Sequence, residues 1–124
     1  MTQKPEGGKR FVSVQSEIED RVFTVDLLRL SNGCFANVAE GANPRLGAIT
    51  ISIKSQQGVN SSTLIPDPRG RIFARTLGEL ITERTEGIAV ISLYLRAEVD
   101  SEITKLLLAQ VSKLLAEIDG KTAS

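Results

Sequence analysis

The first half of the chain alternates apolar and polar residues, the pattern of half-buried β-strands. Leu46–Ser55 is the clearest case, because Ile49, Ile51 and Ile53 alternate there with polar side chains. The same pattern, with turn residues between the segments, predicts four further strands. They are Arg10–Ile18, Arg21–Leu30, Cys34–Ala39 and the shorter Ser61–Ile65.

An Asn-Gly pair separates two of these segments. Asn32 and Gly33 lie between the apolar runs Arg21–Leu30 and Cys34–Ala39. Both residues accept a positive φ at low cost, which is typical of a tight hairpin turn. We therefore expect these two strands to pair antiparallel.

The pattern becomes helical after Ile65. Asp67 can cap a helix whose first turn begins at Pro68, where the missing N–H costs nothing. Apolar residues then recur at the spacing of one helix face between Ile72 and Ile81. Gly87 is the residue expected to end this helix.

A strand and a second helix complete the predicted order. Ile88–Leu95 is apolar almost throughout, as a central strand covered on both faces would be. Asp100 can cap a helix whose apolar stripe runs from Ile103 to Ile118. The order predicts an α+β fold, with a single, mainly antiparallel sheet of about six strands and two helices on one face. We expect one domain at residues 10–118, between flexible tails at 1–9 and 119–124.

The predicted sheet carries more apolar residues than two helices can cover. In the second strand, Val22 and Leu28 alternate with Phe23 and Val25, so both of its sides are apolar. Single apolar residues on a surface are common and are the plainer explanation. A whole apolar face left open is rare in a soluble monomer. We therefore favour a second chain that covers one face of the sheet.

Composition and charge exclude several classes of protein. Fifteen basic and fifteen acidic residues leave none of the basic excess that is usual in a nucleic-acid-binding protein. The polar N-terminus lacks the apolar stretch of a signal peptide, and no apolar run approaches the ~20 residues of a membrane span. A single cysteine rules out an internal disulfide. We expect a protein of the cytosol or nucleus that binds neither nucleic acid nor membrane.

Few residues suggest catalysis. The chain has no histidine, which removes the commonest general base and the commonest zinc ligand. Cys34 follows the predicted turn without an activating base, and free cysteine usually packs as a small apolar residue. Asp26, a charge within an apolar strand, is either a buried functional acid or a residue that points at a sheet edge or a partner. We expect no enzyme activity, cofactor or metal.

Three arginines gather at the start of the first predicted helix. Arg69, Arg71 and Arg75 could bind an anion there, because a helix N-terminus favours negative charge. Capping and loop geometry alone would explain the neighbouring Pro68 and Gly70. An acidic partner protein would use the same arginines.

Three segments resemble the small proteasome assembly chaperones, chaperone 4 more closely than its partner chaperone 3. RLSNGCFANV is the densest match, and LGAITISIKS and LGELITERTEGIAVISLYL are the others. One departure is Ala39-Glu40-Gly41, where the family has Gly directly after Val. The positions that match the family are Arg29, Leu30, Ser31, Phe35, Val38, Arg84, Thr85, Ser92 and Leu95.

The resemblance implies a non-catalytic factor that pairs with a related small chaperone and binds a proteasome α subunit, chiefly the α5 subunit. Such a pair helps to order the α ring of the 20S core and leaves as β subunits arrive. We expect the sheet face with Ile49, Ile51 and Ile53, or the alternate rows, to be buried by the partner. The α subunit is the client of such a chaperone. Our candidates for contact with this client are the charged residues Asp26, Arg69, Arg71 and Arg75. A homodimeric adaptor of similar fold is the alternative, followed by a small enzyme with an anion site at the three arginines.

Overall fold

The computed structural model describes residues 10–120, which form one sheet and two α-helices. The predicted α+β architecture is confirmed. The tail predicted at 1–9 and most of the one predicted at 119–124 lie outside the described residues. The elements in order are β1 (Phe11–Ile18), β2 (Arg21–Leu30), β3 (Gly33–Glu40), β4 (Ala48–Ser55), β5 (Gly58–Ile65), a 3-10 turn (Pro68–Gly70), α1 (Arg71–Thr85), β6 (Ile88–Tyr94) and α2 (Ser101–Ile118).

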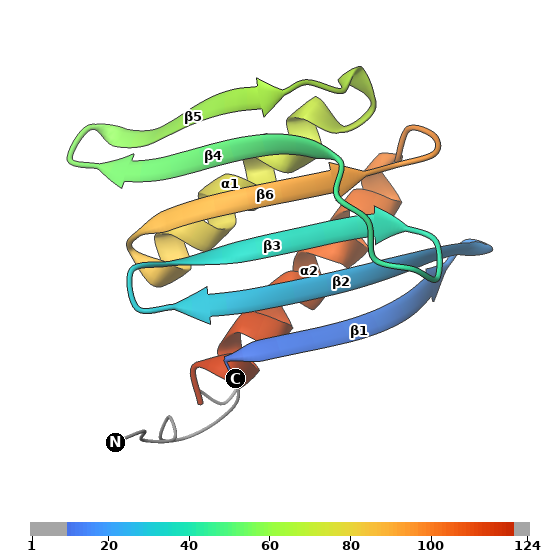
Figure 1. Ribbon diagram of the computed structural model, residues 1–124, viewed down its shortest axis with the longest axis horizontal. Coiled ribbons are helices and arrows are strands. Elements are labelled where there is room, and N and C mark those ends of the chain that lie inside the picture. Colours follow the sequence, from blue (N-terminus) through green and yellow to red (C-terminus); the bar gives the residue numbers. More distant parts are fainter. Residues whose placement is uncertain (1–9, 121–124) are drawn as a thin grey trace.

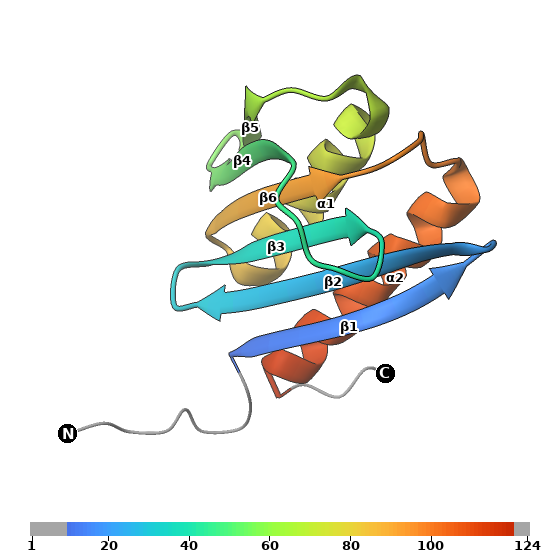
Figure 2. The same cartoon turned by 45° about the vertical axis from the view of Figure 1, so that its right-hand side comes forward.

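The sheet has the strand order β1-β2-β3-β6-β4-β5. Every neighbouring pair is antiparallel except β3 and β6, which run parallel. Because β6 lies between β3 and β4, the connection 41–47 has to cross β6. Figure 1 shows this connection passing in front of the sheet while both helices lie behind it. Figure 2 shows the same two helices together on one side.

The core lies between the sheet and the helices. α1 packs mainly against β4 and β6, and α2 against β1 and β2. Phe23, Val25 and Leu27 enter this core and are fully buried. The residues that alternate with the core residues point to the other side of the sheet, which neither helix covers. We call that side the open face. Its larger apolar side chains are Phe11, Val22, Leu28, Leu30, Phe35, Ile49, Ile51, Ile53, Ile65, Ile88 and Val90.

The hairpin between β2 and β3 confirms the predicted pairing but not the predicted backbone. Leu30 pairs with Gly33, and neither Asn32 nor Gly33 has a positive φ. Gly33 is needed for close approach instead, because a Cβ there would lie 2.1 Å from the carbonyl oxygen of Ile88. The turn with two positive φ angles is the one between β1 and β2, at Glu19 and Asp20.

The first helix begins later than the sequence predicts. The Asp67 carboxylate accepts the backbone N–H of Arg69, as the capping prediction requires, but it caps the 3-10 turn that precedes α1. At the other end, Glu86 takes the left-handed conformation expected of Gly87. The predicted cap of α2 is confirmed, since the Asp100 carboxylate accepts a backbone N–H of its first turn. Within residues 10–120, neither helix is long and apolar enough to span a membrane.

Replacing Gly78 by Ala tests how closely α1 lies on β4. A Cβ at Gly78 would lie 2.1 Å from the Ser52 Oγ and 2.9 Å from its Cβ. On an exposed helix Gly→Ala is stabilising, but here we expect a loss of about 1–3 kcal/mol in the free energy of unfolding, because the helix has to move. Urea unfolding gives the value, with Glu79→Ala as the exposed control. A stabilised Gly78→Ala variant would contradict this packing.

Candidate functional site

The open face carries a continuous apolar area at the end near the β2–β3 hairpin. Two rows of neighbouring side chains cross the sheet there, one through β1, β2, β3, β6 and β4, and the other through β2, β6 and β4. Leu30 and Ile53 each keep 48% of their surface exposed, so the residues from 10 to 120 leave this area open. We call it the apolar patch. Its members are Phe11, Leu28, Leu30, Phe35, Ile51, Ile53, Ile88 and Val90.

Strand β4 turns its polar side to the helices and its isoleucines to the open face. Thr50 and Ser52 are buried beneath α1, and the Ser52 hydroxyl pairs with the Ser61 hydroxyl of β5 at 2.7 Å. Ile51 and Ile53 therefore lie in the apolar patch, and Ile49 lies in the next row, opposite Ser92. This is the reverse of the usual orientation, in which the apolar side of a strand meets the core.

A row of polar residues lies beside the apolar patch. Ser13, Asp26 and Asn37 are neighbours on β1, β2 and β3, and Ser92 continues the row on β6. The Asp26 carboxylate accepts hydrogen bonds from the Ser13 hydroxyl at 2.5 Å and the Asn37 amide at 3.2 Å. Asp26 is 7% exposed and belongs to the second strand of the sheet, so it does not point at an edge.

The connection 41–47 covers the other end of the open face. Its Gly47 N–H donates to the Ser92 hydroxyl at 2.9 Å. The Arg45 guanidinium lies 4.9 Å from the centre of the Tyr94 ring and donates to the Tyr94 hydroxyl. Figure 1 shows this connection crossing the end of the sheet opposite the β2–β3 hairpin. The uncovered part of the open face is therefore the part that holds the apolar patch.

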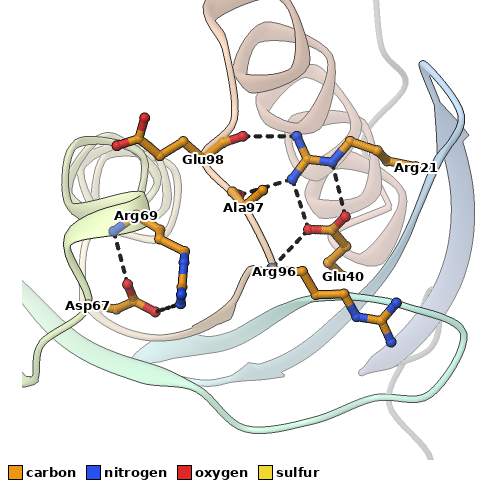
Figure 3. A network of polar contacts seen from close by, with 7 residues as sticks. All are labelled: Arg21, Glu40, Asp67, Arg69, Arg96, Ala97 and Glu98. Atoms are coloured by element: carbon orange, nitrogen blue, oxygen red, sulfur yellow. Dashed lines mark hydrogen bonds and ion pairs between the residues drawn. The ribbon is translucent and has the colours of Figure 1, made fainter.

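An ion pair fastens this covered end to the segment that leads into α2. Two nitrogens of the Arg21 guanidinium donate to the Glu40 carboxylate, at 2.8 and 3.0 Å, and two also donate to the carbonyls of Ala97 and Glu98 (Figure 3). The Arg96 backbone N–H donates to Glu40 as well. The hydrogen bonds from Arg21 hold the pKa of Glu40 below its usual range, although burial opposes the shift. The cluster has a structural role, because each of its donors is already satisfied by an acceptor.

The three candidate arginines lie on the helix side, away from the isoleucines. Arg69 and Arg71 line a groove of about 660 Å³ between the starts of α1 and α2, and Lys105 lies across it. Arg69 is also held by Asp67 at 3.5 Å (Figure 3). Arg75 is exposed one turn further along α1 and does not line the groove. The structure thus separates the predicted contact residues into two groups, with Asp26 and the isoleucines on the open face.

Cys34 is buried in the core, which supports the packing role. Desolvation raises the pKa of its thiol to about 11, although the nearby charge of Arg29 acts in the opposite direction.

Within residues 10–120, no three His, Cys, Asp or Glu side chains come together as metal ligands.

Glu40→Gln tests the ion pair. We expect a loss of ~2 kcal/mol in the free energy of unfolding at neutral pH, because the partly exposed Arg21 guanidinium loses its charged acceptor and one of its two hydrogen bonds to residue 40. A lowered pKa means that the carboxylate stabilises the fold above its ordinary value of 4.5 and ceases to do so as the pH falls. The difference between wild type and variant should therefore shrink below about pH 4.5 in urea titrations. Glu83→Gln, at the exposed pair with Lys54, is the control and should change stability by under about 0.5 kcal/mol.

The thiol of Cys34 should be unreactive in the folded protein. With a pKa of about 11, roughly one molecule in a thousand carries the thiolate at pH 8. A coloured disulfide reagent should therefore modify Cys34 only after the chain is unfolded in guanidinium. Rapid modification of the native protein would restore the nucleophile hypothesis.

Comparison with known proteins finds similarity in fold. No protein-family model matches the chain, and no curated protein matches it. A solved structure, described as "Crystal Structure of a Novel Chaperone Complex for Yeast 20S Proteasome Assembly", contains a chain that matches with a TM-score of 0.51 and 18% identity. The match covers 88% of this chain and 92% of that one, so it extends over nearly the whole fold. The chain therefore shares its architecture with a component of a yeast chaperone complex for 20S proteasome assembly.

Proposed function

We propose that this protein is a non-catalytic assembly chaperone of the 20S proteasome. It pairs with a related small chaperone through the open face and binds an α subunit, of the α5 kind, while the α ring forms. The fold that it shares with a component of a yeast proteasome assembly complex supports the general role. The three segments that resemble the small assembly chaperones support the pairing.

The exposed apolar patch is the observation that carries this proposal. Ile51 and Ile53 face away from the core, while the polar side of the same strand is buried beneath α1. Exposed apolar surface of this extent is usual at protein–protein interfaces and rare on monomers. Each square ångström of apolar surface that a partner removes from water contributes about 25 cal/mol before the costs of association. A second sheet packed on the open face would bury all eight residues of the apolar patch together.

The helix side supplies a separate surface for the client. The groove lined by Arg69 and Arg71 lies on the other side of the sheet from the apolar patch. A companion and an α subunit could therefore be held at the same time, with the rigid sheet fixing their relative orientation. A later subunit that competes for overlapping surface would displace the chaperone. We place this activity in the cytosol or nucleus.

A native pull-down from the protein's own cells tests the proposal. Tagged protein should recover one small companion chain and proteasome α subunits, without mature β subunits, when the bound proteins are identified by mass spectrometry. Recovery of the chain by itself would favour a homodimeric adaptor. Recovery of unrelated proteins would leave only the similarity in fold.

Ile51→Asp should separate this protein from its companion. A carboxylate in the middle of the apolar patch has to be desolvated when the patch is covered, so we expect at least a ~30-fold weaker complex. Leu106→Asp is the matched control, because Leu106 is 45% exposed on α2 and lies outside both the open face and the groove. Co-purification measures both variants, and circular dichroism checks that they are folded. A folded Ile51→Asp variant that keeps its companion would rule out the open face as the interface.

A further inference from the structure

The open face holds a carboxylate that has no cation beside it. Asp26 is 7% exposed, and its carboxylate accepts hydrogen bonds only from Ser13 and Asn37 among the described residues. Both donors are uncharged. None of the ion pairs found in residues 10–120 includes Asp26.

The neighbouring amide leaves an acceptor unused. Asn37 is 4% exposed, and its amide nitrogen donates to Asp26 while its Oδ1 is buried without a partner among the described residues. Buried polar atoms in folded proteins nearly always have a partner. Asp26 and Asn37 therefore present negative charge and a free acceptor next to the apolar patch.

This chain has no basic residue on the open side of its strands. The strands contain three basic residues, Arg21, Arg29 and Lys54, and each lies on the helix side in an ion pair with a residue of its own chain. The connection 41–47 contains one basic residue, Arg45, and its guanidinium is engaged with Tyr94. A second copy of this chain would therefore bring further carboxylates to the interface, and its strands would bring no basic side chain.

We propose that the partner covering the open face carries an arginine or lysine against Asp26 and Asn37, and that this charge selects a related chain over a second copy. The inference rests on the proposed function and names the chemistry of its partner. A carboxylate buried in an interface without a cation is strongly unfavourable, whereas a charge-assisted hydrogen bond to it is among the strongest polar contacts. The apolar patch supplies affinity that does not distinguish partners, and Asp26 supplies the selectivity.

Removing the charge should make the chain bind itself. Asp26→Asn keeps the shape of the side chain, and the full-length protein can be measured by sedimentation equilibrium without any companion. We expect the dissociation constant of the homodimer to fall at least tenfold relative to wild type. Glu17→Gln is the control, because Glu17 is the other acidic residue on the open side of the strands and lies exposed on edge strand β1. An unchanged homodimer constant in Asp26→Asn would overturn the inference.

Ser13→Lys reaches the same end while Asp26 stays in place. Ser13 is exposed on β1 directly opposite Asp26, so a lysine there would neutralise the carboxylate from within the chain. This variant should also tighten the homodimer at least tenfold. The two variants neutralise the site by different changes at different residues, so a folding defect in one does not decide the result.

The companion recovered in the pull-down supplies the second half of the test. Asp26→Asn and Ser13→Lys should each weaken its binding at least tenfold, and Glu17→Gln should leave it unchanged. If Ile51→Asp loses the companion but Asp26→Asn keeps it at full affinity, the open face is the interface and the inference about charge is wrong. If no companion exists, the proposed function and the inference both fail.

Discussion

The closeness of α1 to β4 decides which side of that strand meets water. Gly78 brings the helix so near that even a Cβ would collide with Ser52, and the small hydroxyl side chains of Ser52 and Thr50 fill the space beneath it. Larger side chains do not fit in a space of this depth. The isoleucines of β4 consequently point outward and join the apolar side chains of β2, β3 and β6 on the open face. The apolar surface on the open face thus arises from the way the helix packs.

The insertion of β6 between β3 and β4 limits where a partner can dock. It forces the connection 41–47 across the open face, and the contacts of Gly47 with Ser92 and of Arg45 with Tyr94 hold that connection down. The Arg21–Glu40 pair fixes the same end of the sheet to the segment before α2. The free part of the open face is then an apolar patch with a polar row along one side. In our proposal such a surface favours one partner and one orientation, because a cation of the partner has to meet the charge of Asp26.

The proposed chaperone role agrees with this division of surfaces. In this proposal the apolar patch contributes affinity for the companion, and Asp26 distinguishes the companion from a second copy of the chain. The groove near Arg69 and Arg71 is a second surface, proposed for the α subunit. Burial raises the pKa of the Cys34 thiol to about 11, which argues against its use as a nucleophile. The chain shares its fold with a component of a yeast proteasome assembly complex, and that likeness is what prompts the proposed role.

The sequence alone determined the order of elements, because periods of two and of 3.6 residues and the capping residues Asp67 and Asp100 act locally. It also determined that the sheet has more apolar surface than two helices can cover. The tertiary structure decided which side of β4 is covered, that β3 and β6 run parallel, and that Asp26 lies buried beside Asn37. These outcomes depend on contacts between residues far apart in the chain. An alternating strand looks the same in sequence whichever of its sides the helix approaches.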